Sequence, residues 1–201
     1  MVQSLQIESP KWTFIFIALS VAGFLFQMVT NFWGYFAFFP ASAFESPWMF
    51  VTSIFLHADI EHLFFNMLVL FFLGINLERS IGRKAFVILF FVSGIVGNLG
   101  YLITTMMLGG NAFTPAIGAS GAIYGIIGAL ATLAPMMMVF IGMMPMPMIL
   151  VAVFWGFMDF AGLFAPSDIA HGAHLGGMFV GIAFGLYVRW KVHQRFTKYQ
   201  R

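Results

Sequence analysis

Residues 118–125 read Gly118-Ala119-Ser120-Gly121-Ala122-Ile123-Tyr124-Gly125. One hydroxyl flanked by glycines interrupts a long apolar sequence at this point. Glycines at positions 121, 125 and 128 share one face of a helix, because residues three and four apart are neighbours on a helix surface. Small residues on one face let two membrane helices approach closely. The stretch therefore predicts a tightly packed membrane helix that carries the hydroxyl of Ser120 near its start.

The composition extends this interpretation to the whole chain. The 201 residues are 61% hydrophobic and only 8% charged, whereas a soluble domain carries about 25% charged residues. Long apolar runs recur along the sequence, which is typical of a polytopic helical membrane protein. The chain has no cysteine, so disulfides and thiolate chemistry are excluded. No basic segment precedes the first apolar run, so we expect no cleaved signal peptide.

Crossing the hydrocarbon core takes about 20 apolar residues. On that measure the sequence predicts an all-α bundle of six membrane helices, at residues 12–31, 60–77, 85–108, 118–133, 146–164 and 170–190. The end of the fourth is the least defined, since apolar residues continue to position 148, but Pro135, Pro145 and Pro147 indicate a break. The predicted organisation is a cytoplasmic N-terminus (1–11), a six-helix domain (12–190) and a basic cytoplasmic tail (191–201).

The basic residues predict the orientation. With six spans and both termini inside, all nine Lys and Arg residues lie on the cytoplasmic side, and Glu45, Asp59, Glu61 and Asp168 lie on the other. We therefore expect a multi-pass protein of the cell membrane whose tail lies near anionic lipid. The basic residues do not indicate a nucleic-acid partner. The apolar connection 32–59 is expected to rest in the membrane interface.

Polar side chains gather at one predicted depth. His62 and Asn66 begin the second span, Ser120 begins the fourth, and His171 and His174 begin the sixth. These three spans all run inward from the outer face, so the five side chains lie near the outer third of the bilayer. Polar groups at membrane depth are costly and are functional candidates.

A nucleophile and its base can be assigned within this group. Glycines 177, 181 and 185 follow His174 on one face of its helix, and contact with the glycines after Ser120 would bring the two side chains together. A serine hydroxyl needs an adjacent base to become nucleophilic, and histidine supplies one near neutral pH. No carboxylate is adjacent to either residue in sequence, so we predict a dyad.

The neighbouring polar groups have predicted supporting roles. The Asn66 amide, the His62 ring and the backbone N–H of Ser120 are candidate donors to an oxyanion. Tyr124, one turn after Ser120, is placed to support His174 by stacking or through its hydroxyl. Alternatives remain: a serine among glycines is often only a packing contact, and His62 and Asn66 can simply tie the 32–59 connection to the bundle.

Four other polar residues have mainly structural interpretations. His57 is expected to tie the 32–59 connection, and His171 to shape the site or carry a hydrogen bond. Glu78 is expected to accept bonds from a neighbouring loop or to pair with a basic residue. For Asp159, a buried structural hydrogen bond is favoured over a role as a proton or ion ligand.

Four motifs together resemble those of the rhomboid intramembrane serine proteases, over nearly all of the chain. They are Gly118-Ala119-Ser120-Gly121 with Tyr124, Ala173-His174-Leu175-Gly176-Gly177, His62-x-x-x-Asn66, and Gly74-x-x-x-Glu78-x-x-x-Gly82. One departure is that Met49 follows Trp48, where many members have arginine. The resemblance implies a six-helix fold and cleavage of transmembrane protein substrates near the outer end of a helix, by Ser120 and His174 without metal or cofactor.

The resemblance also frames two further hypotheses and three rivals. Loop 165–169 is a candidate cap, and the fifth span a candidate lateral gate. The first rival is a catalytically inactive relative that binds membrane helices, and the second is a transporter. The third is a metalloenzyme that uses His57, His62, His171 and His174, although no H-E-x-x-H motif occurs.

Overall fold

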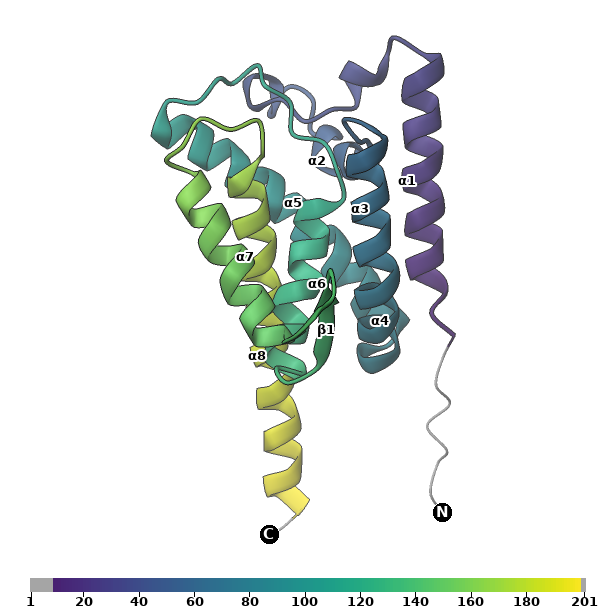
Figure 1. Cartoon of the computed structure of the whole chain (residues 1–201), viewed down its shortest axis with the longest axis vertical. Coiled ribbons are helices and arrows are strands. Elements are labelled where there is room, and N and C mark those ends of the chain that lie inside the picture. Colours follow the sequence, from purple (N-terminus) through teal and green to yellow (C-terminus); the bar gives the residue numbers. More distant parts are fainter. Residues whose placement is uncertain (1–8, 200–201) are drawn as a thin grey trace.

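The computed structural model describes residues 9–199, and side chains through residue 194. Residues 1–8 and 200–201 of the predicted N-terminus and tail lie outside this range. Its long helices form a bundle (Figure 1), and the start of α1 and the end of α8 lie at the same end of it. The helices of the bundle are α1 (Lys11–Val29), α3 (Ile60–Val69), α4 (Ile75–Ile81), α5 (Arg83–Leu108), α6 (Ser120–Leu133), α7 (Met148–Gly162) and α8 (His171–Tyr199).

Short elements complete the described chain. A π-helical segment, η4 (Leu70–Gly74), joins α3 to α4, so that one continuous helix runs over Ile60–Ile81. The connection 32–59 folds into four short helical pieces and does not form an open loop. They are η1 (Trp33–Tyr35), η2 (Pro40–Ser42), α2 (Met49–Thr52) and η3 (Ser53–Phe55).

Four helices of the described chain are long and apolar enough to cross a membrane: Lys11–Val29, Ile60–Ile81, Arg83–Leu108 and His171–Gln194. This agrees with a helical membrane protein. The other two apolar helices, α6 and α7, have 14 and 15 residues, or about 21 to 23 Å at 1.5 Å per residue. Both are shorter than the roughly 30 Å hydrocarbon core, so the count of six spans stays a prediction.

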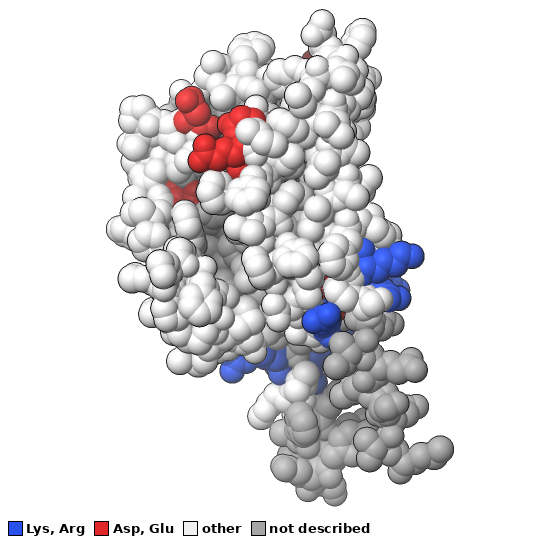
Figure 2. Space-filling model, turned by 45° about the vertical axis from the view of Figure 1, so that its right-hand side comes forward, with Lys and Arg blue, Asp and Glu red and all other residues white. Residues whose placement is uncertain are grey.

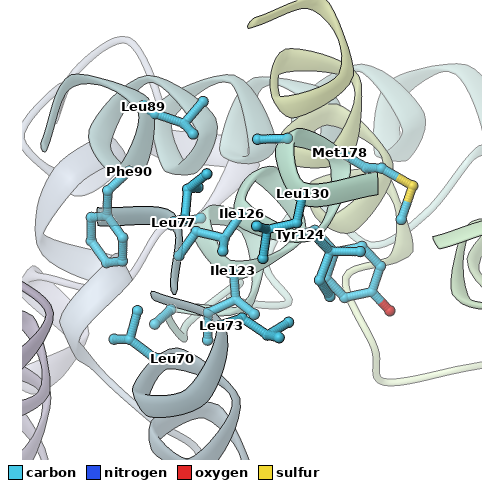
Figure 3. Packing of buried hydrophobic residues seen from close by; sticks show 14 of the residues in the cluster. Leu70, Leu73, Leu77, Leu89, Phe90, Ile123, Tyr124, Ile126, Leu130 and Met178 are labelled. Atoms are coloured by element: carbon cyan, nitrogen blue, oxygen red, sulfur yellow. The ribbon is translucent and has the colours of Figure 1, made fainter. Parts of the chain in front are cut away.

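Helix α6 forms the centre of the bundle. Every residue from 121 to 131 is buried, and Figure 3 shows Ile126 and Leu130 packed among side chains of α4, α5 and α8. A helix enclosed by protein on all sides does not need a lipid-facing surface of full membrane thickness. This enclosure explains how a short helix rich in Gly and Ala occupies the middle of a membrane bundle.

The glycine stripes of α6 and α8 meet, as the sequence predicts. A Cβ atom on Gly177 would collide with the carbonyl oxygen of Gly121, and one on Gly181 with that of Gly125. The two backbones are therefore in direct contact, which fixes the start of α6 against the first turns of α8. Helix α5 shares this arrangement, because a Cβ on Gly97 would lie 2.8 Å from the carbonyl oxygen of Ala173. The close approach of α5 was not predicted.

The prediction of an all-α chain is wrong between α6 and α7. The segment forms an antiparallel hairpin of β1 (Met138–Ile141) and β2 (Met144–Pro147), with Ile141 paired to Met144. Gly142 turns the chain with a φ of 60°. The break that the prolines indicated is present. Hydrophobicity alone did not reveal the strands, because both faces of this hairpin are apolar.

Charge separates along the bundle. Figure 2 shows Asp and Glu side chains near one end of the face in view, and Lys and Arg side chains near the opposite end. The buried Glu78 is satisfied by α1: its carboxylate accepts the backbone N–H groups of Trp12 and Thr13, at 2.9 and 2.8 Å, and the Thr13 hydroxyl at 2.8 Å. Glu78 thus caps the start of α1, where unpaired N–H groups favour an anion.

Candidate active site

The side chains of Ser120 and His174 are in hydrogen-bonding contact. Ser120 is the first residue of α6, and His174 lies in the first turn of α8. The Oγ of Ser120 lies 2.9 Å from Nε2 of His174, and both residues are partly buried. The glycine contact between α6 and α8 holds the helix starts side by side, so two residues 54 positions apart meet.

Tyr124 supports this pair from the next turn of α6. Its ring is stacked on that of His174, with centroids 4.2 Å apart and planes 10° apart. A stacked ring restricts rotation of the imidazole about its side-chain bonds. The ring of His174 is therefore held in the plane in which Nε2 faces Ser120.

The other ring nitrogen of His174 faces a carboxylate. Nδ1 lies 2.8 Å from Oδ1 of Asp159 on α7, and the same oxygen lies 2.7 Å from Nδ1 of His171. Asp159 is only 4% exposed. The reason for predicting a dyad, that no carboxylate adjoins the two residues, holds in sequence but not in space. The signal that could have revealed this contact is the depth of Asp159 in the membrane, because Asp159 lies near the end of α7 that meets the start of α8.

His62 and Gly118 border the same space as the Ser120 hydroxyl. Gly118 has a φ of 128°, and the point where its Cβ would stand lies 2.9 Å from Nε2 of His62 and 3.8 Å from Oγ of Ser120. The backbone N–H of Ala58 donates to Nδ1 of His62, at 3.4 Å. Because Nδ1 accepts, the proton of a neutral His62 lies on Nε2, which is the nitrogen beside this space.

The two other candidate donors to an oxyanion differ in their present contacts. Asn66 is buried, and its Nδ2 donates to the carbonyl of His62 at 2.8 Å, so this amide is directed along its own helix. Ser120 begins α6, and its backbone N–H is among the first four of that helix, which have no partner within it. Gly121, the other glycine named in the motif, packs against the carbonyl oxygen of Ala173.

His57 joins the 32–59 connection to α1 and to the approach to Ser120. Its backbone exchanges two hydrogen bonds with the Gln27 side chain, and its Nε2 accepts the N–H of Ala119 at 3.5 Å. Burial, with a smaller effect of neighbouring His62, lowers the pKa of His57 to about 3. A neutral, buried His57 agrees with the structural role expected for it.

A cavity and a group of potential metal ligands adjoin the site. The cavity has a volume of about 520 Å³ and lies between the end of α5 and the segment 162–172, with His171 in its wall. Asp159, His171 and His174 each offer a ligand atom, and these atoms all lie within 4.8 Å of one another. Their mutual hydrogen bonds account for the cluster without an ion, but its donors also suit zinc.

Comparison with known proteins identifies the family. The family model of the rhomboid domain matches residues 45–191. The mitochondrial Rhomboid protein 1 of Saccharomyces cerevisiae is 31% identical over 72% of this chain, and the Rhomboid protease GluP of Bacillus subtilis is 31% identical over 88%. The chain spans only 43% and 35% of the length of these two relatives.

One relative carries a different functional name. The Inactive RHOMBOID-like protein 8 of Arabidopsis thaliana is 34% identical over 41% of this chain, which spans 22% of that protein. Similarity of sequence therefore extends to active and inactive branches of one family. The rhomboid domain nevertheless covers most of the chain, and it includes every residue of the candidate site. The chain belongs to the rhomboid family.

Proposed function

We propose that this protein is an intramembrane serine endopeptidase, with Ser120 as nucleophile and His174 as general base and acid. The observation that carries the proposal is the 2.9 Å contact between Oγ of Ser120 and Nε2 of His174, beside the stacked ring of Tyr124. An alcohol hydrogen-bonded to an oriented imidazole is the arrangement required for nucleophilic catalysis. Its position at the start of two membrane helices directs this chemistry to substrates within the bilayer.

The reaction follows from the two ring nitrogens and the hydroxyl. Nε2 of His174 takes the proton of Ser120 while Oγ attacks the peptide carbonyl carbon, forming a tetrahedral intermediate. His174 then gives that proton to the leaving amine, and an acyl-enzyme remains. His174 then takes a proton from water as the water attacks the ester carbon, and returns that proton to Oγ of Ser120 when the ester C–Oγ bond breaks. Each step needs only one proton carrier, which stays within hydrogen-bonding distance of the reacting oxygen.

The oxyanion of the intermediate is placed in the space beside Gly118. His62 offers its Nε2–H there, and the backbone N–H of Ser120 offers a second donor. Asn66 adds a third donor when its amide leaves the carbonyl of His62. Removing one such donor typically lowers kcat by about 10²- to 10³-fold.

The substrate is a transmembrane protein cut near the outer end of a helix. A helix satisfies its own backbone hydrogen bonds in lipid and hides its peptide bonds, so the segment that is cut must unwind.

We place both termini in the cytoplasm, with six spans in the cell membrane, because the basic end of the molecule is the end at which α1 begins and α8 ends. Loop 165–169 acts as a cap and α7 as a lateral gate.

Purified wild type in liposomes with a model transmembrane substrate tests the proposal. We expect Ser120→Ala and His174→Ala to be folded and to lose at least about 10³-fold in rate. Ser80→Ala is the matched control, because this exposed serine bonds only within its own helix at the opposite end of the bundle, and it should keep wild-type turnover. Cleavage by folded Ser120→Ala would exclude the proposal. No cleavage by wild type, with binding of substrate retained, would favour an inactive relative.

A chelator arm distinguishes the metalloenzyme that the Asp159, His171 and His174 cluster would allow. Activity that survives a strong zinc chelator supports the serine mechanism. Loss of activity that added zinc restores would overturn it.

The lateral gate is tested separately. Because the chain lacks cysteine, an introduced pair of cysteines can cross-link α7 to α3 without side reactions. Full turnover by the cross-linked protein would contradict gating by α7.

A further inference from the structure

Asp159 is the one acidic residue of α7, and it lies beside the ring nitrogen of His174 that does not contact Ser120. Its Oδ1 is 2.8 Å from Nδ1 of His174, while Nε2 of the same ring is 2.9 Å from Oγ of Ser120. The three side chains, which come from three helices, form one hydrogen-bonded chain. The mechanism proposed above, with Ser120 and His174 alone, assigns no role to the buried carboxylate of Asp159.

The chemistry of the contact determines where the proton of His174 lies. An ionised carboxylate only accepts hydrogen bonds, and a neutral imidazole has one N–H and one lone pair. With Asp159 at Nδ1, the N–H is on Nδ1 and the lone pair of Nε2 faces the Ser120 hydroxyl. In the opposite tautomer Nε2–H would donate to Oγ of Ser120 and could not accept its proton, and Asp159 would face the lone pair of Nδ1. Asp159 also stabilises the imidazolium that forms when His174 takes a proton.

The carboxylate itself is held in place. His171 donates from Nδ1 to the same Oδ1 at 2.7 Å, and its Nε2 is 3.1 Å from the hydroxyl of Ser167, which lies in the loop after α7. Gly162 makes room for this ring, since a Cβ there would collide with it. Two imidazoles on one face of α8 thus fix the orientation of Asp159.

We propose, resting on the serine protease function above, that Asp159 is a positioning residue that holds His174 in its Nδ1–H tautomer, so that the site works as a Ser120–His174–Asp159 triad. His171 fixes Asp159 and does not touch the reacting atoms. Because Asp159 belongs to α7, any movement of α7 away from α8 withdraws the carboxylate from the base. Opening of that helix and full reactivity of Ser120 are then mutually exclusive.

The first test compares Asp159→Asn with wild type in the liposome assay. The amide is isosteric but uncharged and can turn its NH₂ towards Nδ1, which permits the wrong tautomer. We expect kcat to fall by about 10²- to 10⁴-fold, KM to change by less than about threefold, and labelling of Ser120 by a fluorophosphonate to slow in parallel. Asp159→Glu, which restores the charge, should recover part of the loss. His171→Gln removes the contact between His171 and Asp159 but keeps the one between His174 and Asp159. The kcat of this variant should therefore fall less than tenfold.

The second test reads the proton position in the wild type, so it does not depend on the folding of an Asp159 variant. In ¹⁵N-histidine NMR of the wild type, with His174 assigned from its absence in His174→Ala, we expect a proton on Nδ1 and none on Nε2. A proton on Nε2 overturns the proposal, as does a folded Asp159→Asn variant with wild-type kcat. Either result leaves the protease proposal intact, whereas a wild type that neither cleaves nor reacts with fluorophosphonate defeats the protease proposal itself.

Discussion

The imidazole of His174 lies parallel to the phenol ring of Tyr124, 4.2 Å from centroid to centroid. Both residues are fixed by their helices, Tyr124 one turn into α6 and His174 in the first turn of α8. The stacked ring closes one face of the base, so the imidazole cannot turn its edge away from Ser120. The geometry of the reactive pair therefore depends on a residue that takes no part in proton transfer.

The role of the ring can be separated from that of the hydroxyl. We expect Tyr124→Phe to keep kcat within about fivefold of wild type, and Tyr124→Ala to lower it by about 10²-fold, since misplacement of a catalytic group by 1 Å can have an effect of that size. Kinetics in liposomes and a fold check by circular dichroism measure this. Equal losses in both variants would assign the role to the hydroxyl.

Gly118 is expected to tolerate no side chain. Its φ of 128° disfavours L-residues, and a Cβ would lie 2.7 to 2.9 Å from the His62 ring. Such backbone strain costs about 1–3 kcal/mol. Gly118→Ala should therefore lower the melting temperature and, by displacing His62, reduce kcat by at least about tenfold. The exposed Gly109 also has a positive φ, of 72°, but has nothing within 4 Å of its Cβ position. Gly109→Ala therefore carries the strain alone and should keep kcat; an equal loss of kcat in both variants would contradict displacement of His62.

The sequence predicted the central contact because periodicity carries it. Glycines at helical spacing after Ser120 and His174 indicated a backbone-to-backbone approach, and the structure has that approach at Gly177 and Gly181. Contact between these two glycine stripes places the starts of α6 and α8, and with them Ser120 and His174, at the same depth in the bundle. Local spacing was enough here, since both stripes lie within single helices.

Other contacts left no such local pattern. Asp159 reaches His174 from α7, and the exposed or buried state of a lone acid in an apolar run cannot be read from its neighbours in sequence. The apolar hairpin after α6 lacked the alternation of apolar and polar residues that marks a half-buried strand. The N–H groups at the start of α1 that donate to Glu78 lie more than 60 residues away in sequence, beyond any helical periodicity.

Widening the contact between α6 and α8 should abolish both the fold and the site. We expect Gly181→Val to destabilise the protein severely, because its Cβ would meet the Gly125 carbonyl oxygen in a packed interface. Overpacking of this kind costs about 1–3 kcal/mol or more. Gly34→Ala, with nothing within 4 Å of its Cβ position, should melt like wild type. Thermal unfolding in detergent measures both, and a wild-type melting curve for Gly181→Val would refute the close packing.

The lowered pKa of His57 predicts how the free energy of unfolding depends on pH. Burial lowers its pKa in the folded protein to about 3, against about 6.5 in the unfolded chain. Between these values the unfolded chain binds a proton that the folded protein does not, so stability is full above pH 6.5 and falls as the pH drops towards 3. The loss is at most about 1.4 kcal/mol per pH unit. Melting curves from pH 7 to pH 4 should therefore fall more steeply for wild type than for His57→Gln. Equal slopes for His57→Gln and wild type would show that folding does not lower the pKa of His57.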